Sequence, residues 1–462
     1  MASQNTNGKL ERGLGLTQAT ALNMIDMVGI GPFVVVGEVI REMGGPHALL
    51  AWGAGALLAA LDGFIWSELG AAMPLAGGSY VFLREAYGPA RWGRLMSFLF
   101  IWQTLFQAPL VMASAAIGFA KYFGYLVPAE TLHPKIVRVA LILFVAVLLY
   151  RRITAIGKIS VLIWTGVLAT MGWLIIGGAM HFDASLLEVP AGAWDFSWPF
   201  FAGLGAASVQ TIYTYLGYYN VCHLGAEIAQ PQRNIPRSIF LSIGGIAVLY
   251  LAMQTSILGV VPWQEAKESD FVVSLFAEKL YGAGTAKFAT AMVLWIAFGS
   301  LFSLTLGYSR VPYAAALDGT FFSVFGRVHE KRRFPHVSLL FLTGVALVYV
   351  LLFDALRDVI RGILAMRTLV QFIGGAVGLV LLRQMWPAER FPYRMWLYPL
   401  PVVVVVAAWL AIFVATGYGY FGGVRIHFAL AGTALMAAGA VVFVVRAWMR
   451  NEWPFATADK QS

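Results

Sequence analysis

Long apolar runs recur along the whole sequence and constrain its fold more than any other feature. A bilayer core of about 30 Å is crossed by about 20 apolar residues in a helix, and backbone polar groups inside lipid must be satisfied within the spanning structure. Twelve runs approach or exceed this length. They cover residues 17–40, 48–71, 95–120, 136–150, 159–180, 199–224, 239–261, 288–314, 337–353, 363–382, 397–414 and 428–445. We therefore predict an all-α membrane protein with twelve transmembrane helices.

Composition places the chain among multi-pass membrane proteins and excludes a soluble one. Hydrophobic residues make up 60% of the 462, charged residues make up 12%, and the mean hydropathy is +0.75. A net charge of +9 could suggest nucleic acid, but the lysines and arginines lie in short clusters between the apolar runs, where the positive-inside rule places them. The expected partner is the lipid bilayer and not a nucleic acid.

An even number of spans puts both termini on one side of the membrane. On that side lie 21 of the 32 lysines and arginines, so it is predicted to be the cytoplasm, with the protein in the cell (inner) membrane. The first fifteen residues lack the apolar core of a signal peptide, so the first span is expected to remain in the mature protein. We predict a cytoplasmic tail at 1–16, a single membrane domain at 17–450 and a cytoplasmic tail at 451–462.

The stretch MVGIGPFVVVGE, residues 27–38, interrupts the first span. Pro32 has no N–H, so the carbonyl of Val28 loses its helical partner, and Gly29 and Gly31 permit unwound backbone angles. Each unsatisfied group costs several kcal/mol in lipid, so such a break is tolerated only where protein, water or a bound solute supplies partners. The break is a candidate binding site, and a simple proline kink is the alternative.

A second irregular stretch, YTYLGYYNVCH at residues 213–223, lies in the sixth span. Gly217 stands near its middle, and the polar residues Tyr218, Tyr219 and Asn220 follow. Breaks in the first and sixth spans are what an inverted repeat of five plus five helices predicts, with two extra helices at the end. Half-helix N–H groups attract an anion and half-helix carbonyls attract a cation, so a zwitterion would satisfy both.

Five motifs in a fixed order carry a resemblance to a known family. They are VGIGPF at 28–33, SELGAAMPLAGGSYVFLREAYG at 67–88, YLGYYNVCHLGAEIAQPQRNIPRSI at 215–239, YSRVPYAAALDG at 308–319 and RFPYRMWLYPLP at 390–401. The sequence resembles the amino acid-polyamine-organocation superfamily of permeases from about residue 14 to about residue 446. The resemblance is closer to the amino-acid permease branch that includes the L-type transporters than to sodium-driven branches.

The resemblance implies a secondary transporter that works by alternating access. The cluster of spans one, two, six and seven would move against a more static scaffold. Residues 17–450 would then be one transporter domain, with one repeat at about 17–180, a second at about 197–385 and the two extra helices at about 396–446.

The resemblance also places the substrate at the two breaks, where backbone N–H groups bind a carboxylate and nearby carbonyls bind an amine. A position that is often serine in relatives is Ile30 here, which removes a hydroxyl contact but leaves backbone recognition. Some relatives that carry cationic substrates have an acid where Tyr219 stands, so a neutral amino acid is expected. Ordinary aromatic packing is the alternative for the tyrosines. The implied substrate-binding positions are Val28, Gly29, Ile30, Gly31, Tyr213, Thr214, Leu216, Gly217, Tyr218, Tyr219 and Asn220.

Ionisable groups within the spans are candidates for coupling or gating, because their burial is costly. Asp26 is the first candidate for a coupling proton, although it could instead hydrogen-bond the unwound backbone without titrating. Several proton-driven relatives hold a lysine in the middle of the fifth span, but the aligned position here is Gly166 or Val167. The nearest lysine is Lys158, toward the cytoplasmic edge. Arg367 in the tenth span could close an outer gate or attract substrate anions, or its side chain could extend to the membrane interface.

Other polar residues of the motifs have simpler interpretations. Sodium would need oxygen ligands such as Ser300, Ser303 and Thr305, but hydroxyls in membrane helices more often bond their own backbone. Glu227 is expected to be a structural hydrogen-bond partner. The segment PLAGGSY at 74–80 is interpreted as a cytoplasmic re-entrant segment with tight glycine turns. In the segment at 226–239, a helix end and a turn are expected, because the two prolines Pro231 and Pro236 cannot continue a regular helix.

Two other functions stay open at this point. A cationic amino-acid or polyamine transporter would use Asp26 as an amine partner, and a non-transporting amino-acid sensor could share the fold. An enzyme is disfavoured, because no nucleophile–base pair or metal-ligand cluster appears in the spans, and no cofactor or metal is expected. The single cysteine, Cys222, permits no intramolecular disulfide. The expected partners are a small-molecule amino acid, the lipid bilayer and a candidate proton, and the sequence gives no indication of oligomeric state.

Overall fold

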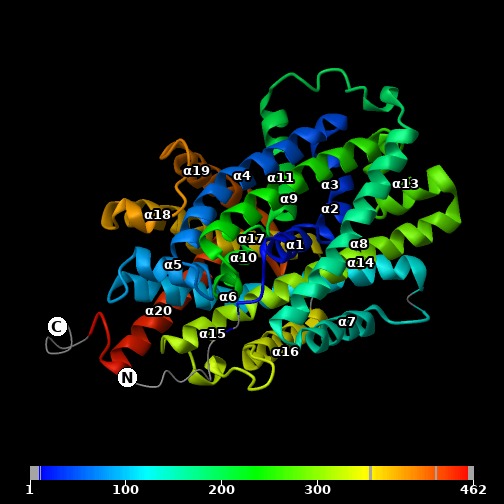
Figure 1. The fold of residues 1–462 in the computed structure, drawn as a ribbon. Coiled ribbons are helices and arrows are strands. Elements are labelled where there is room, and N and C mark those ends of the chain that lie inside the picture. Colours follow the sequence, from blue (N-terminus) through cyan, green and yellow to red (C-terminus); the bar gives the residue numbers. More distant parts are fainter. Residues whose placement is uncertain (1–9, 11, 129, 353–355, 422–423, 456–462) are drawn as a thin grey trace.

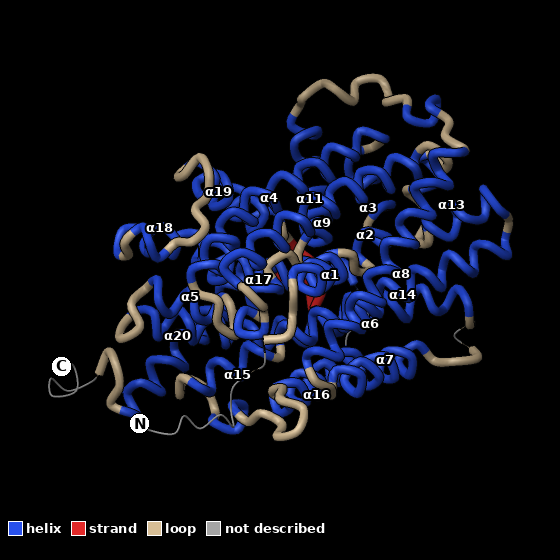
Figure 2. The backbone as a smooth tube through the Cα atoms, in the orientation of Figure 1, coloured by secondary structure: helices blue, strands red, loops and turns tan. Residues whose placement is uncertain are grey.

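The computed structural model describes residues 10, 12–128, 130–352, 356–421 and 424–455, and this part of the chain is almost entirely helical (Figure 1; Figure 2). Much of the two predicted tails, residues 1–9, 11 and 456–462, lies outside the described residues, as does the last residue of the predicted span 337–353.

The helices mostly follow the predicted spans. In the first half they are α1 (Leu16–Met27), α2 (Gly31–Val34), α3 (Val36–Met43), α4 (Leu49–Ala72), α5 (Ser79–Ala86), α6 (Trp92–Leu126), α7 (Pro134–Leu149) and α8 (Ile153–Met180). In the second half they are α9 (Trp198–Tyr215), α10 (Asn220–His223), α11 (Pro231–Leu258), α12 (Trp263–Ala266), α13 (Val272–Tyr281), α14 (Ala283–Tyr308), α15 (Arg310–Leu317), α16 (His336–Leu352), α17 (Leu356–Arg367), α18 (Gly374–Met385), α19 (Leu400–Ala415) and α20 (Phe428–Arg450). Short 3-10 helices are η1 (Pro46–Ala48), η2 (Ala184–Leu187), η3 (Gly225–Glu227), η4 (Ser323–Gly326) and η6 (Ala388–Arg390), and a π-helical turn, η5 (Thr368–Ile373), joins α17 to α18.

Length and hydropathy show that this is a multi-pass membrane protein. Among the described residues, seven helical stretches are long and apolar enough to cross a bilayer: Pro46–Ala72, Trp92–Leu126, Ile153–Met180, Pro231–Leu258, Ala283–Leu317, Asp358–Met385 and Phe428–Arg450. An eighth span is formed if Leu16–Val34 and Val36–Met43, which meet at a 59° bend, cross as one unit. Two further apolar helices, His336–Leu351 and Leu400–Ala415, are shorter.

The prediction for 226–239 is right in one part and wrong in another: η3 ends at Glu227 and a bend containing Gln230 (φ +45°) follows, but the two prolines do continue a regular helix. α11 begins at Pro231 and runs through Pro236 without interruption. Proline is favoured at the first helical position, since its missing N–H would have no partner there. Pro236 lies in the second turn, so α11 loses one backbone hydrogen bond near its N-terminal end and continues as a helix.

One short element departs from the all-α prediction. Strands β1 (Tyr418–Phe421) and β2 (Val424–His427) pair antiparallel between α19 and α20, with Tyr418 opposite His427. Both strands are rich in aromatic or β-branched residues, which suits a pleated ribbon. They lie outside the apolar runs, so the helical character of the spans is unaffected.

The interrupted helices lie at the centre of the molecule. α1 packs against α8, α11 and α14, while α4 packs against α9, α11 and α19. The long helix α6 contacts α5, α7, α14, α16, α17 and α20. Figure 1 shows α5 and α15 at one end of the molecule and α3 and α13 at the opposite end.

The segment between α4 and α5 folds back against the second broken helix, with the tight glycine turns that were expected for PLAGGSY. The N–H of Gly77 donates to the carbonyl of His223 at 3.1 Å. Gly77 has φ +97°, and a Cβ there would stand 2.6 Å from the Cβ of Ala314. Only glycine combines this backbone angle with so close an approach.

Candidate functional site

The first helix is interrupted where the sequence predicted. α1 ends at Met27, Val28 leaves the helical region with ψ 67°, and helical conformation resumes at Gly31. The N–H of Val28 still bonds to the carbonyl of Met24 at 2.9 Å, but the N–H groups of Ile30 and Gly31 make no hydrogen bond to any described residue. The break therefore presents two backbone donors to its surroundings.

The second break lies directly beside the first. α9 ends at Tyr215 and α10 begins at Asn220, and the backbone at Leu216 is extended. Gly217 has φ +125°, and a Cβ on it would lie 2.9 Å from Oδ2 of Asp26. Glycine is required both by this angle and by the contact between the two breaks. The sequence motif thus explains how the two unwound segments touch.

Side chains of α1 and α11 bond to backbone groups at the two breaks. The hydroxyl of Tyr250 on α11 donates to the carbonyl of Met27 at 2.6 Å and to that of Thr214 at 3.1 Å. On α1, Oδ1 of Asn23 accepts a hydrogen bond from the N–H of Val221 at 2.9 Å. These bonds tie both breaks to one tyrosine and show how protein groups replace the lost helical bonds in lipid.

A cavity of about 50 Å³ lies between the two breaks. A water molecule needs about 10–15 Å³ of such space, so the cavity has room for about four waters or a small polar solute. Helices α1, α2, α6, α9, α14 and α17 and the two unwound segments enclose it. The lining residues are Asp26, Met27, Gly29, Ile30, Gly31, Pro32, Val111, Ala115, Tyr213, Thr214, Leu216, Gly217, Tyr219, Ser300, Leu304, Tyr308 and Arg367.

Two side chains of opposite charge face this cavity. Arg367 is 3% exposed, donates to the hydroxyl of Tyr219, and lies 5.6 Å from the ring centre of Tyr219 and 5.3 Å from that of Tyr308. Its guanidinium therefore does not extend to the membrane interface. The carboxylate of Asp26 makes no hydrogen bond or salt bridge to any described residue, so both of its oxygens are available to a solute.

Most of the predicted positions come together at this cavity. Those that line it are Asp26, Gly29, Ile30, Gly31, Tyr213, Thr214, Leu216, Gly217, Tyr219 and Arg367. Ile30 also packs closely against Gly118 on α6, where a Cβ would stand 2.6 Å from Cγ2 of Ile30.

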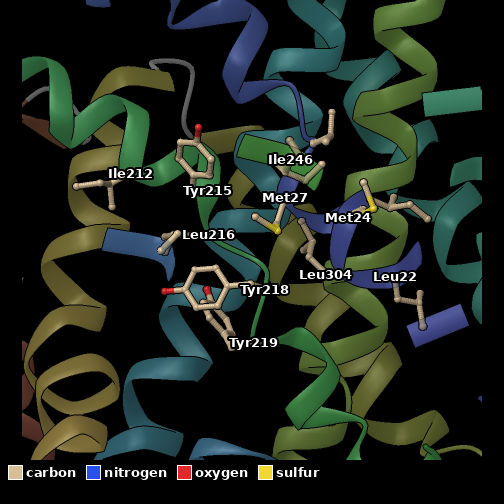
Figure 3. Packing of buried hydrophobic residues seen from close by; sticks show 14 of the residues in the cluster. Leu22, Met24, Met27, Ile212, Tyr215, Leu216, Tyr218, Tyr219, Ile246 and Leu304 are labelled. Carbon is tan, nitrogen blue, oxygen red and sulfur yellow. The ribbon is translucent and has the colours of Figure 1, made fainter. Parts of the chain in front are cut away.

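Four predicted positions do not reach the cavity. Val28 is buried at the end of α1, and Lys158 is exposed near the start of α8. Asn220 donates instead to the carbonyl and the hydroxyl of Ser303, both at 3.1 Å. Tyr218 turns away from Leu304, and its hydroxyl donates to Asp62 at 2.5 Å (Figure 3). The two neighbouring tyrosines therefore have different partners, because the hydroxyl of Tyr219 accepts a hydrogen bond from Arg367 at the cavity.

The hydroxyls proposed for a sodium site are already engaged. Thr305 donates to the carbonyl of Leu301 in its own helix at 2.6 Å, as expected. Ser303 donates to the carbonyl of Leu22 on α1 at 2.6 Å, and Ser300 lies 3.4 Å from that of Asp26.

The structural interpretation of Glu227 is confirmed. Its two carboxylate oxygens accept hydrogen bonds from Arg310 at 2.8 and 2.7 Å, and both side chains are buried. The backbone carbonyl of Glu227 accepts from the N–H groups of Gly13 and Leu14 at 3.0 Å. The ion pair therefore joins α15 to the segment after the second break, and the backbone carbonyl of Glu227 joins that segment to Gly13 and Leu14.

Two residues of interest were missed in the sequence. Tyr308 lines the cavity and faces Arg367, although its motif was noted only for resemblance. Asp62 is an acidic residue in the middle of the apolar run 48–71. Because burying an acid in a membrane span is costly, its position in the sequence alone marks it as a candidate functional residue.

Comparison with known proteins decides the family. The sequence model of a family described as "Amino acid permease" matches residues 14–445. The chain belongs to the amino acid permease family. Family membership makes this permease an amino-acid transporter, and the family and its relatives are transporters rather than enzymes.

Curated relatives are similar over most of their length. The Asc-type amino acid transporter 1 of Mus musculus is 26% identical over 450 residues, covering 93% of this permease and 81% of the relative. The methylthioribose transporter of Bacillus subtilis (strain 168) is 24% identical over 425 residues, covering 89% of each. The serine/threonine exchanger SteT of the same organism is 24% identical over 403 residues, covering 86% of this permease and 89% of the relative.

Proposed function

We propose that this permease moves small neutral amino acids across the cell membrane by alternating access, binding each as a zwitterion at the two helix breaks. The observation that carries the proposal is the cavity where both breaks meet, with backbone donors of Ile30 and Gly31 free on one side. Free donors and a carboxylate beside one small cavity are complementary to the two ends of an amino acid.

Each end of the zwitterion has a partner of the required type. The N–H groups of Ile30 and Gly31, with the guanidinium of Arg367, suit the substrate carboxylate. The carboxylate of Asp26, with the carbonyls at the end of α1, suits the substrate ammonium. Hydrogen bonds to charged groups contribute about 1.5–3 kcal/mol each, so a few such contacts support binding of a small solute.

The lining favours a neutral side chain. Arg367 already places a positive charge in the cavity, and a cationic substrate side chain would add a second one nearby. The small cavity volume of about 50 Å³ favours a small substrate. The relative named as a serine/threonine exchanger is consistent with this choice.

A second candidate is transport of cationic amino acids, which Asp26 favours because its carboxylate is free of protein partners. A relative named cationic amino acid transporter 4, of Homo sapiens, is 25% identical over 396 residues, covering 81% of this permease and 60% of that relative. In that case Asp26→Asn would abolish transport of cationic substrates and spare neutral ones.

The finer architecture belongs to the proposal as well. It comprises twelve spans in a five-plus-five inverted repeat with two extra helices, both termini in the cytoplasm, and coupling to protons or to exchange. The moving unit would be α1–α3, α4, α9–α10 and α11. The positions of the breaks in α1–α2 and α9–α10 support the repeat.

Counterflow in proteoliposomes tests the proposed function. The purified permease is loaded on the inside with each member of a panel of neutral, cationic and acidic amino acids, and with methylthioribose. We expect counterflow with small neutral amino acids. Counterflow with methylthioribose alone, or binding without counterflow, would contradict the proposal. Protein-free liposomes are the control.

A further inference from the structure

A buried acid lies next to the second break but outside the cavity. Asp62 is in the middle of α4 and is 0% exposed. Its Oδ2 accepts hydrogen bonds from the hydroxyl of Tyr218 at 2.5 Å and from Nε1 of Trp66 at 3.0 Å. Its Oδ1 makes no hydrogen bond to any described residue. One carboxyl oxygen is therefore well solvated by the protein and the other is not.

No cation from the described part of the elements around α4 compensates this acid. Arg383 of α18 bonds to Glu68, one oxygen at 2.6 Å and the other at 2.7 Å. The arginines of α11, Arg233 and Arg237, are exposed in its first two turns. α9 and α19 carry no charged residue. The other titratable groups on the packed elements are Tyr213 and Tyr215 on α9, Tyr250 on α11, His47 on η1 and, in the second break, Tyr218 and Tyr219.

The environment of Asp62 can hold both protonation states. An ionised carboxylate without a cation is costly in the membrane interior, which favours the neutral acid. The indole of Trp66 can only donate, which favours the carboxylate, whereas the hydroxyl of Tyr218 can donate to the carboxylate or accept from the acid. The short contact to Tyr218 therefore survives gain or loss of a proton by reversing its direction.

Tyr218 connects Asp62 to the substrate cavity through the backbone. It lies in the unwound segment 216–219, and Figure 3 shows its ring beside that of Tyr219 with the hydroxyl directed away from Met27. Its neighbour Gly217 abuts Asp26 at the cavity. A shift of this segment would move the Tyr218 hydroxyl relative to α4, which changes how well Asp62 is solvated.

We propose that Asp62 is the proton-binding site of this permease and that it exchanges its proton as the segment 216–219 moves Tyr218. The inference rests on the proposed amino-acid transport and names the residue that couples it to protons. One proton from outside water forms the O–H bond of the Asp62 acid, and the same proton passes to inside water when that bond breaks. Each zwitterion carried is then accompanied by one positive charge.

Two variants and a control separate this role from substrate binding. Asp62→Asn keeps the size of the neutral acid and cannot exchange a proton, whereas Asp26→Asn changes a group that lines the cavity. Asp195→Asn removes an exposed loop carboxyl and serves as the control. The readouts are substrate binding, accumulation driven by a pH gradient in proteoliposomes, and the infrared carbonyl band of a protonated carboxylic acid.

The expected results are specific to Asp62. With a gradient of one pH unit, the transport of one proton per substrate supports an inside-to-outside substrate ratio of about ten. We expect Asp62→Asn to abolish this accumulation. Substrate affinity should stay within a few-fold, and the infrared band that titrates with pH should disappear. Asp26→Asn should weaken binding but keep the band, and Asp195→Asn should change neither.

Other outcomes overturn the proposal in distinguishable ways. If Asp62→Asn still accumulates substrate or keeps the infrared band, Asp62 does not carry the proton. If the wild type shows counterflow of amino acids but never accumulates them under a pH gradient, coupling to protons is refuted and the proposed transport stands. If the wild type binds no amino acid, the proposed function fails, while the infrared titration of Asp62 is still measured. Should Asp62→Asn not fold, Tyr218→Phe is used, which must shift the midpoint of the pH profile to higher pH because the carboxylate loses a donor.

Discussion

Adding one methyl group at Gly31 should weaken substrate binding without disturbing the fold. Gly31 begins α2 with helical backbone angles and lines the cavity. A Cβ there would stand 3.2 Å from Cγ2 of Thr214 and 3.4 Å from Cε1 of Tyr213. These contacts are tight but require shifts of only a few tenths of an ångström. Alanine also keeps the N–H of Gly31, so the loss is one of space rather than of a hydrogen-bond donor.

The size of the effect follows from the cavity. A methyl group takes about the space of one water, about 10–15 Å³, which is about a quarter of the 50 Å³ available. A misplaced methylene in a binding pocket costs about 1–3 kcal/mol. The dissociation constant should therefore rise about 5- to 150-fold. The free energy of unfolding should change by less than about 1 kcal/mol, because the helix preference of alanine offsets the tight contacts.

Calorimetric titration of the detergent-solubilised Gly31→Ala variant with the substrate found by counterflow measures this change. Gly53→Ala is the matched control, since Gly53 is a helical glycine of α4 and a Cβ there would meet nothing within 4 Å. If Gly31→Ala is folded and its dissociation constant stays within twofold of that of the wild type, the cavity between the breaks is not the substrate site.

Three further predictions concern other parts of the chain. Arg367→Met keeps an unbranched side chain but removes the positive charge that faces the cavity, so the KM for uptake should rise at least tenfold in initial-rate kinetics. An unchanged KM would contradict a role of Arg367 in substrate binding. Glu227→Gln leaves the guanidinium of Arg310 buried without a counter-charge, so the free energy of unfolding in denaturant titrations should fall by about 3–5 kcal/mol. Adding Arg310→Met to this variant should recover part of the lost stability. The pKa of Asp183 is held below its ordinary value by hydrogen bonds from the hydroxyl and the N–H of Ser185, so its stabilisation of the turn it begins is present above the ordinary pKa and is lost as the pH falls through the lower one. The protection of the η2 amides against hydrogen exchange, relative to their intrinsic exchange rates at each pH, should fall in acid in the wild type but not in Asp183→Asn.

Helix breaks are among the features that could be predicted from the sequence. Pro32 removes an N–H, and the two glycines that precede it, Gly29 and Gly31, permit unwound backbone angles. The interruption between Met27 and Gly31 therefore follows from the local covalent chemistry of these residues. Gly217 signals the second break in the same way. The proline rule failed at Pro236, because a proline near the start of a helix costs too little to end it.

Which side chains of a break face the substrate could not be predicted in this way. Tyr218 and Tyr219 are adjacent and chemically identical, yet one reaches Asp62 and the other reaches Arg367. Their directions depend on the path of an unwound segment, for which there is no helical period to read. Arg367, the partner of Tyr219, lies on a helix about 150 residues further along the sequence.

By itself the sequence determined that this is a helical membrane protein with two interrupted spans, because hydropathy and the conformational limits of glycine and proline act over a few residues. Only the tertiary structure decided that the two breaks touch, that Asp26 and Arg367 face one cavity, and that Asp62 lies behind it. These arrangements depend on how distant helices pack, and the energy of packing is shared among many contacts that no local pattern records.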